Sequence, residues 1–179
     1  MRKLVESTFV SLDGRISNPQ EWSPPYWDDE HGAYASKLLF AADALLLGRA
    51  TYEGFVQAWP SRSGDPFSDQ INSMPKYVAS RTLTEPLGWN ASLITGDLDM
   101  AIPALKAEHR GNLIVSGCGE LAHSLTRQGS VDEFWFWINP FIWAEGPRIF
   151  DGVGPVRLEL VAATPYRSGV VWLRYRPAG

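Results

Sequence analysis

The stretch NLIVSGCGELAHSL, Asn112 to Leu125, carries the strongest structural signal in the sequence. Leu113 to Val115 form a short apolar run, which is typical of a strand covered on both faces of a sheet. The small residues 116–119 then allow a sharp turn and let another molecule approach the backbone closely. Apolar residues recur at helical spacing over 120–128, and Gly129 follows as a stop. The stretch therefore predicts a strand, a glycine turn and a helix in succession.

This turn has two interpretations that its own residues do not separate. The first turn of a helix has N–H groups without partners and a partial positive charge, so it favours an anionic group such as a phosphate. A tight connection between a strand and a helix that binds nothing would have the same sequence. Both interpretations stay open at this point.

Length and composition limit the class of protein. The chain has 179 residues, which fits a single domain, 1–179, with a substantial core. Apolar residues make up 45% and charged residues 20%, the balance of a soluble globular protein. The formal net charge of -4 argues against a nucleic acid or an anionic membrane surface as the main partner.

Cysteine, histidine and hydropathy patterns exclude several other classes. The single cysteine, Cys118, rules out an intramolecular disulfide and suits a reducing compartment. The N-terminal sequence is too short and too polar for a signal peptide, and no apolar run approaches the roughly 20 residues of a membrane span, so we expect a cytoplasmic protein. His31, His109 and His123 lack the spacing of metal ligands. We expect no metal and interpret them as histidines on helix surfaces.

Strand-like and helix-like segments alternate along the chain. Strands are expected at 3–11, 44–47, 76–79, 92–95, 113–115, 132–139, 156–161 and 170–175. Helices are expected at 33–42, 51–58, 98–109 and 120–128, and loops at 12–30 and, apart from a single helical turn, at 61–73. This order predicts an α/β fold with a mixed, largely parallel sheet, helices on both faces and a closing pair of strands.

Three expected strands end in residues that suit a phosphate. These ends are Gly48-Arg49-Ala50-Thr51, Ser80-Arg81-Thr82 and Ser116-Gly117-Cys118-Gly119. Ligands of open α/β sheets bind at the carboxyl ends of strands. Arg49 and Arg81 offer fork-shaped donors to a phosphate, and Thr51 could cap its helix or bind an oxygen. Taken alone, each strand end would also fit arginines exposed to solvent and an ordinary helix cap. The three strand ends together favour a dinucleotide-binding site.

Seven motifs in a fixed order resemble the dihydrofolate reductase superfamily, in the branch that contains the reductase domain of the bifunctional riboflavin-biosynthesis enzyme. They are SLDGRI (11–16), ADALLLGRATYEGF (42–55), KYVASR (76–81), NLIVSGCGELAHSL (112–125), VDEFWFWINPFIW (131–143), EGPRIF (145–150) and SGVVWLRY (168–175). The resemblance covers nearly the whole chain. It implies a dihydrofolate-reductase-like mixed, mostly parallel sheet with flanking helices and C-terminal antiparallel strands, and NADPH as the cofactor.

The resemblance also implies roles for individual residues. The cofactor would be bound by Gly48, Arg49 and Thr51 at one helix start, by Ser80 and Arg81 beside the adenosine 2′-phosphate, by Ser116, Gly117, Cys118, Gly119, Glu120 and Leu121 at the glycine turn, and by Ile16 near the nicotinamide. We expect Asp13, Trp27 and Tyr34 to contact the substrate. The first helix, however, carries no acid over 31–39, where folate-reducing members have a carboxylate.

These features lead to two functional hypotheses. The first is an NADPH-dependent reductase, similar to dihydrofolate reductase or 5-amino-6-(5-phosphoribosylamino)uracil reductase. It would transfer a hydride to a small carbonyl compound or to a pterin-like or riboflavin-precursor-like heteroaromatic. The second is a non-catalytic nucleotide- or ligand-binding protein that keeps the fold, and the missing carboxylate supports it.

Aromatic residues in the segment 134–143 indicate self-association. Phe134 and Phe136 face one way in the expected strand, and Trp135 and Trp137 face the other. Three more large apolar residues follow at 141–143, which is more apolar surface than one domain readily covers. We therefore expect a homodimer through this segment, as the resemblance also implies. Burial under helices on both faces would explain the same pattern.

Overall fold

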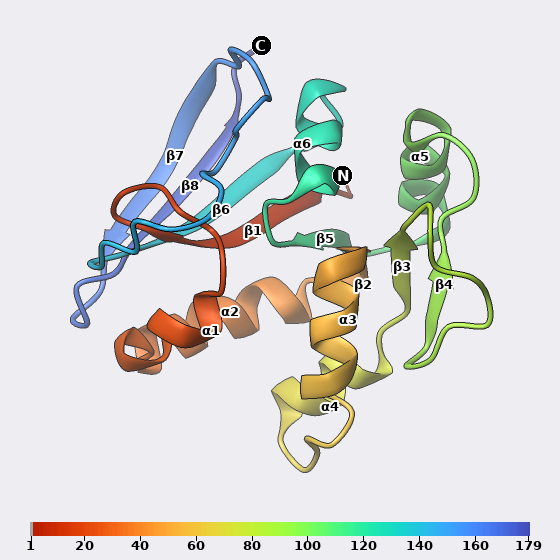
Figure 1. The fold of residues 1–179 in the computed structure, drawn as a ribbon, viewed down its shortest axis with the longest axis horizontal. Helices are drawn as coiled ribbons and strands as arrows, with labels where there is room; N and C mark the ends of the chain where they lie inside the picture. Colours follow the sequence, from red (N-terminus) through yellow and green to blue (C-terminus); the bar gives the residue numbers. More distant parts are fainter. Residues whose placement is uncertain (1) are drawn as a thin grey trace.

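The structure, a computed structural model, describes residues 2–179. Its strands are β1 (Leu4–Ser11), β2 (Ala42–Gly48), β3 (Lys76–Ala79), β4 (Ala91–Leu93), β5 (Asn112–Ser116), β6 (Glu133–Asn139), β7 (Leu158–Pro165) and β8 (Val171–Pro177). They form one eight-stranded sheet in the order β4-β3-β2-β5-β1-β6-β8-β7 (Figure 1). Neighbours from β4 to β6 are parallel, whereas β8 is antiparallel to both β6 and β7. This confirms the expected mixed sheet with C-terminal antiparallel strands.

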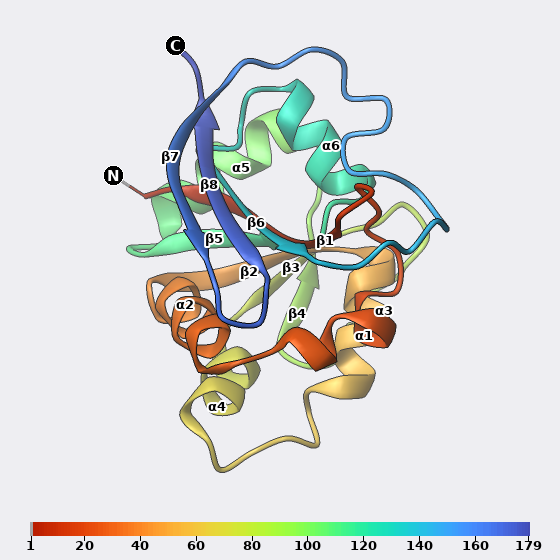
Figure 2. The ribbon, with the colours of Figure 1, turned by 90° about the vertical axis from the view of Figure 1, so that its left-hand side faces the viewer.

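Helices cover both faces of the sheet. They are α1 (Pro19–Trp22), the 3-10 helix η1 (Pro24–Tyr26), α2 (Asp29–Phe40), α3 (Arg49–Ala58), α4 (Pro66–Ser73), α5 (Leu98–Glu108) and α6 (Glu120–Arg127). Figure 2 shows α5 and α6 on one side of the sheet and α2, α3 and α4 on the other. The buried side chains form two clusters that follow this division, with Leu105 and Leu125 in one and Leu39 and Ile71 in the other. Within residues 2–179, none of the helices is long and apolar enough to cross a membrane.

Helices occur in two segments that we expected to be loops. In 12–30, α1 and η1 each begin with a proline, Pro19 and Pro24. The expected helix at 33–42 also starts earlier, as α2, where Asp28 Oδ1 accepts the N–H of His31 at 2.8 Å. In 61–73, Asp65 caps α4 in the same way by accepting the N–H of Ser68 at 2.9 Å, and Pro66 occupies the first turn. The loop predictions were wrong there because short, polar helices have a weak apolar period. The first-turn prolines of α1, η1 and α4, and the Asp65 cap of α4, were the better signal.

The register of the central strands produces a step in the sheet. β1 pairs with β5 as far as Ser7 and Ser116, but it continues beside β6 as far as Ser11 and Asn139. The chain therefore turns out of the sheet at the end of β5, whereas β1 and β6 continue side by side beyond that point. This places the glycine turn after β5 beside the last part of β1, to which it is tied by the hydrogen bond from Gly117 N to Ser7 O at 2.9 Å.

The aromatic side chains of β6 are buried within the chain. Phe134 and Phe136 pack on one face and Trp135 and Trp137 on the other, as expected, and all four are at most 7% exposed. Neighbouring strands and the helix layers cover them, so this strand leaves no aromatic patch for a second copy. The homodimer itself stays a prediction.

Candidate functional site

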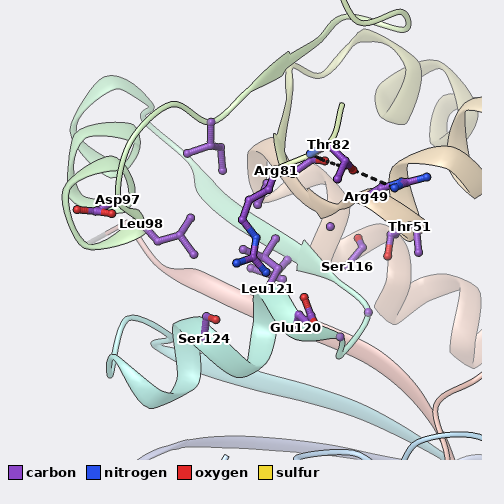
Figure 3. A pocket seen from close by; sticks show the side chains of 18 of the residues that line it. Arg49, Thr51, Arg81, Thr82, Asp97, Leu98, Ser116, Glu120, Leu121 and Ser124 are labelled. Atoms are coloured by element: carbon purple, nitrogen blue, oxygen red, sulfur yellow. Dashed lines mark hydrogen bonds between the residues drawn. The ribbon is translucent and has the colours of Figure 1, made fainter. Parts of the chain in front are cut away.

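An open cleft of about 920 Å³ lies at the carboxyl ends of β2, β3 and β5 (Figure 3). The starts of α3, α5 and α6 and the loop after β3 form its walls. The predicted cofactor residues among its lining are Gly48, Arg49, Thr51, Ser80, Arg81, Ser116, Gly117, Gly119, Glu120 and Leu121. The topology thus brings three strand ends, far apart in the sequence, into one cleft. Of the predicted cofactor residues, only Ile16 and Cys118 lie outside its lining.

The helices that begin at the cleft have no side-chain caps. The cap positions of α3 and α6 are Gly48 and Gly119, and glycine has no side chain that could accept a first-turn N–H. Asp97 precedes α5 but makes no capping hydrogen bond with its side chain. First-turn N–H groups have no helical partner and carry a partial positive charge. The starts of α3 and α6 are therefore suited to an anion.

Two glycines of the turn after β5 allow a close approach to the backbone. Gly117 has a φ of +80°, a left-handed conformation that favours glycine, and a Cβ there would lie 3.5 Å from Thr51 Oγ1. Gly119 has a φ of -101°, which any residue adopts. A Cβ on Gly119 would meet nothing within 4 Å, so the space beside it is open in the protein itself.

The two arginines of the cleft are held differently. Arg49 is bonded within the protein, because its Nε donates to Glu53 Oε1 at 2.8 Å and its Nη1 donates to Thr82 Oγ1 at 2.9 Å. Figure 3 shows the Arg81 side chain extending into the cleft toward Leu121. Arg81 is therefore the guanidinium that is better placed to meet a ligand.

The predicted residue Ser80 shapes the loop after β3. Its Oγ accepts the backbone N–H of Thr82 at 3.2 Å and that of Leu83 at 3.0 Å, which closes a tight turn. The turn presents Arg81 at the cleft. Acidic side chains stand elsewhere on the cleft wall, at the starts of α5 and α6 and in α3. The positive charge is thus concentrated at the ends of β2 and β3.

Cys118 lies beneath the glycine turn and not in the cleft. Its side chain is buried next to the carboxyl group of Glu6 in β1, which is fully buried. Burial, with a further contribution from Glu6, raises the pKa of the thiol. Burial also raises the pKa of Glu6 well above its ordinary value. The thiol is therefore an unreactive part of the core, and only the backbone of Cys118 can face a ligand.

The loop after β1 is tied to the segment after β6. The Asp13 carboxylate accepts the N–H of Trp143 and the N–H of Ala144, each at 3.0 Å, and the hydroxyl of Ser11 at 2.6 Å. The bond from Ser11, followed by that from Trp143, holds the pKa of Asp13 well below its usual range. The structure thus gives Asp13 a role in bracing these loops. Ile16, in the same loop, packs against the core.

Trp27 and Tyr34 belong to an aromatic region on the α2 side of the sheet. The Trp27 indole stacks on the His31 imidazole with ring centroids 4.1 Å apart, and the Tyr34 ring lies 4.5 Å from Trp172. His31 is only 2% exposed, so our interpretation of it as a surface histidine was wrong. The available signal was the neighbouring aromatic residues, Trp27 just before the helix and Tyr34 three positions after His31 on the same helical face.

The acids at the start of α2 are engaged by the β7–β8 hairpin. Asp28 Oδ2 accepts the N–H of Ser168 at 3.2 Å, and Glu30 Oε2 accepts the N–H of Arg167 at 2.9 Å. Both carboxylates thus hold the β7–β8 hairpin against α2, while Asp29 is exposed. Substrate protonation by an acid in this helix therefore has no support in the geometry of the described residues.

Comparisons with known proteins agree with this fold. The sequence model of the RibD C-terminal domain family matches residues 2–172. The uncharacterized protein YyaP of Bacillus subtilis (strain 168) is 27% identical over 183 residues, which cover 97% of this chain and 94% of that protein. A candidate riboflavin biosynthesis protein from Shewanella sp. PV-4 matches with a TM-score of 0.78 at 21% identity, over 99% of each chain. Dihydrofolate reductase from Enterococcus faecalis, solved with NADP(H), matches with a TM-score of 0.64 at 18% identity, over 99% of this chain and 97% of that one. The expected dihydrofolate-reductase-like fold is confirmed.

Proposed function

The chain belongs to the RibD C-terminal domain family, and from this premise we propose that it is an NADPH-dependent reductase of the riboflavin-pathway type. The observation that carries the proposal is the cleft, where two uncapped helix starts and two arginines meet at neighbouring strand ends. Phosphate groups favour N–H donors at helix starts and the fork of a guanidinium. The dihydrofolate reductase that shares this fold was solved with NADP(H), which supports the same cofactor here.

The residues of the cleft fit a dinucleotide phosphate. The open space beside Gly119 leaves room for a pyrophosphate against the backbone, and the starts of α3 and α6 supply N–H donors to it. Arg81 would bind the 2′-phosphate that distinguishes NADPH from NADH. When it is bound, NADPH supplies the hydride for reduction. The chain's own residues bind the cofactor, orient it and set the preference for NADPH over NADH.

The substrate of the proposed reaction is a small heteroaromatic or carbonyl compound. The half-exposed Trp27 and the partly buried Tyr34 offer flat apolar surfaces to such a molecule. We propose a pterin-like or riboflavin-precursor-like ring as this substrate. This assignment also agrees with the reductase type of the family.

A non-catalytic nucleotide-binding protein is the second candidate function. The observation that favours it is the engagement of Asp28 and Glu30 by the β7–β8 hairpin, which leaves the aromatic region without a carboxylate from α2. Such a protein would bind NADPH through the same cleft and would not oxidise it.

One pair of measurements separates the two candidates. Binding of NADPH is followed by fluorescence titration, and its oxidation is then followed with a panel of pterins, pyrimidines and quinones. We expect binding, and oxidation with at least one of the nitrogen heterocycles. Binding without oxidation across the panel would favour the non-catalytic candidate, and absence of binding would contradict both.

A further inference from the structure

A buried carboxyl group in β1 lies next to the glycine turn after β5. Glu6 is 0% exposed, and within residues 2–179 neither of its oxygens has a nitrogen or oxygen partner. The polar group that it meets is the thiol of Cys118, in the turn itself. Burying a carboxyl group with so few partners is costly. The proposed reaction does not use this group, so its place beside the turn requires another reason.

The pairing of β1 with β5 sets the distance between this carboxyl group and the turn. Glu6 is in register with Val115, two residues before Gly117, and the neighbouring Ser7 accepts the N–H of Gly117 at 2.9 Å. Neighbouring strands of a sheet lie only about 4.8 Å apart. The carboxyl group therefore borders the turn from inside the protein, whereas the cleft borders the turn from outside.

The side chain of Cys118 is held inside the protein from two directions. Besides meeting Glu6, its sulfur accepts the N–H of Phe150, and the Phe150 ring packs edge-on against Phe134 and Phe136 at centroid distances of 5.8 Å and 5.7 Å. The backbone N–H groups of Cys118 and Gly119 donate to no backbone carbonyl within residues 2–179. With the thiol fixed in the core, these N–H groups remain available to an anion in the cleft.

The surroundings of Glu6 offer no charge that would balance an ionised carboxylate. Glu6 shares a face of β1 with Leu4 and Val10, and α5, α6 and the segment 149–153 cover that face. The Cys118 thiol is the titratable group that acts on it within residues 2–179. The other titratable groups of the surrounding elements lie elsewhere: Asp99, Glu108, Glu120, Arg127 and Asp151 are exposed, His123 lies near Arg127 and Asp151, Lys106 is paired with Asp132, and Glu133 is bonded to Trp135 on the opposite face of the sheet.

We propose that Glu6 is a proton-linked positioning residue of the cofactor site. Its neutral carboxyl group supports the glycine turn through Cys118, and the loss of its proton places a negative charge behind the turn and weakens the binding of a pyrophosphate in front of it. Taking NADPH as the source of this pyrophosphate rests on the proposed reductase function. The opposition between the Glu6 charge and a phosphate at the turn does not.

The direction of the pH effect follows from the burial of Glu6. Burial raises its pKa well above the ordinary value, so the neutral acid persists to higher pH than in an exposed glutamate. A phosphate at the turn disfavours the carboxylate further, so the complex keeps this proton to a higher pH than the free protein does. Binding therefore takes up protons from the solvent in that range. The affinity falls as pH rises through the pKa of the free protein.

NADPH titrations at several pH values test this linkage. The dissociation constant would be measured by fluorescence at pH 6, 7, 8 and 9 for the wild type, Glu6→Gln and Glu6→Leu. Two unit charges roughly 10 Å apart in a protein change a binding constant roughly tenfold. We therefore expect the wild type to lose roughly tenfold more affinity across this range than either neutral variant. Titration of the cofactor and of other side chains cancels in the comparison.

Glu108→Gln is the matched control. Glu108 is the exposed last residue of α5, outside the cleft lining, so this variant should keep the pH dependence of the wild type. Glu6→Leu buries no polar group, so it keeps the test decisive if the buried amide of Glu6→Gln disturbs folding.

Proton uptake gives a second readout, which a merely structural role of Glu6 would not change. Calorimetric titration with NADPH in two buffers of different ionisation enthalpy counts the protons taken up on binding. In the part of the pH range where the affinity of the wild type falls, we expect the wild type to take up more protons than Glu6→Gln or Glu6→Leu, by up to one per NADPH bound.

Equal pH dependence of NADPH binding in the wild type and both neutral variants would overturn the proposal, and so would equal proton uptake. If NADPH does not bind, inorganic pyrophosphate takes its place in the same titrations. A pH dependence of pyrophosphate binding that the neutral variants lack would then show that the reductase function fails and the role of Glu6 stands. Absence of pyrophosphate binding as well would overturn both.

Discussion

Arg49 donates a hydrogen bond from its Nη1 to the Oγ1 of Thr82, 2.9 Å away, which ties the start of α3 to the loop after β3. Its Nε is paired with Glu53 at the same time. Arg81, next to Thr82 in the sequence, instead extends into the cleft (Figure 3). The sequence predicts the same phosphate-binding role for the two arginines, but their side chains lie differently in the structure. Arg49 shapes the cleft, and Arg81 extends into it without a hydrogen bond to the described residues 2–179.

This difference predicts unequal effects on cofactor preference. Arg81→Ala should weaken NADPH binding roughly tenfold or more, because a charge-assisted contact to a phosphate contributes about 1.5–3 kcal/mol. It should change NADH binding much less. Arg49→Ala should weaken both cofactors to a similar extent, because the loss of its bond to Thr82 disturbs the loop. Fluorescence titration with both cofactors measures these changes.

Arg157→Ala is the matched control for the arginine variants. Arg157 is exposed and precedes β7, outside the cleft, so its removal should leave both affinities unchanged. Equal weakening of NADPH and NADH binding by Arg81→Ala would show that Arg81 does not recognise the 2′-phosphate.

Gly119→Ala tests whether a ligand approaches the turn after β5. The added Cβ meets nothing within 4 Å in the protein, so the fold tolerates it. A pyrophosphate against this backbone would meet the methyl group, and we expect NADPH binding to weaken at least tenfold. Stability should fall by no more than about 1 kcal/mol, because alanine is a poorer cap than glycine. Titration and denaturant unfolding measure the two effects separately.

Gly54→Ala in α3 serves as the control. Gly54 is exposed, lies outside the cleft lining and also has an open Cβ position. Alanine there should stabilise the helix by about 0.5–1 kcal/mol and leave NADPH binding unchanged. If Gly119→Ala binds NADPH as tightly as Gly54→Ala does, no ligand lies against that turn.

Most of the fold could be predicted because the strands have clear local patterns. The apolar run of β5, the glycine turn and the helix after it appear where the pattern places them, and so does the alternation of β6. The cleft could be predicted for a similar reason, since carboxyl ends of parallel strands meet at one edge of a sheet. Each of the predicted cofactor residues in its lining lies within a few positions of a strand end.

The remaining features depend on contacts between residues far apart in the sequence, which no local sequence pattern indicates. The bracing role of Asp13 requires Trp143 and Ala144, which are far along the chain. The burial of His31 requires rings from β1, β6 and the β7–β8 hairpin. The strand β6 is apolar on both faces in either case, so its sequence could not tell burial within the chain from burial between two copies.

If the protein forms a homodimer, the structure favours a different surface for it. β7 is an edge strand of the sheet (Figure 1), and Leu160 and Val161 on it are 57% and 42% exposed. An edge strand with exposed apolar side chains is a ready site for pairing with another chain. We expect sedimentation at micromolar concentration to detect a dimer, and Leu160→Lys to shift it toward the monomer of 19.9 kDa.

Ile142→Lys distinguishes the two candidate surfaces. Ile142 is 67% exposed and belongs to the segment 134–143. If Ile142→Lys dissociates the dimer and Leu160→Lys does not, the interface lies on that segment after all. A wild-type monomer that persists as concentration rises would refute self-association through either surface.

Glu6 in β1 predicts a pH-dependent stability. Its side chain is fully buried beside the weakly polar thiol of Cys118, and within residues 2–179 neither carboxyl oxygen has a nitrogen or oxygen partner. Burial raises its pKa well above the ordinary 4.5. Above pH 4.5 the unfolded chain therefore releases a proton that the folded chain keeps. The contribution of Glu6 to stability must then fall as pH rises from 4.5 toward the raised pKa.

Glu6→Gln removes this titration, and Glu6→Leu also removes the buried polar group. We expect the free energy of unfolding of the wild type to fall between about pH 5 and pH 8 relative to that of Glu6→Gln. Glu6→Leu should be more stable than the wild type at the higher pH by roughly 1–3 kcal/mol, the usual cost of a buried group without a partner. Denaturant unfolding of the three proteins at both pH values measures this, and other titrating groups cancel in the comparison. If the free energy of unfolding changes with pH in the same way in the wild type and Glu6→Gln, Glu6 keeps the same charge across this range.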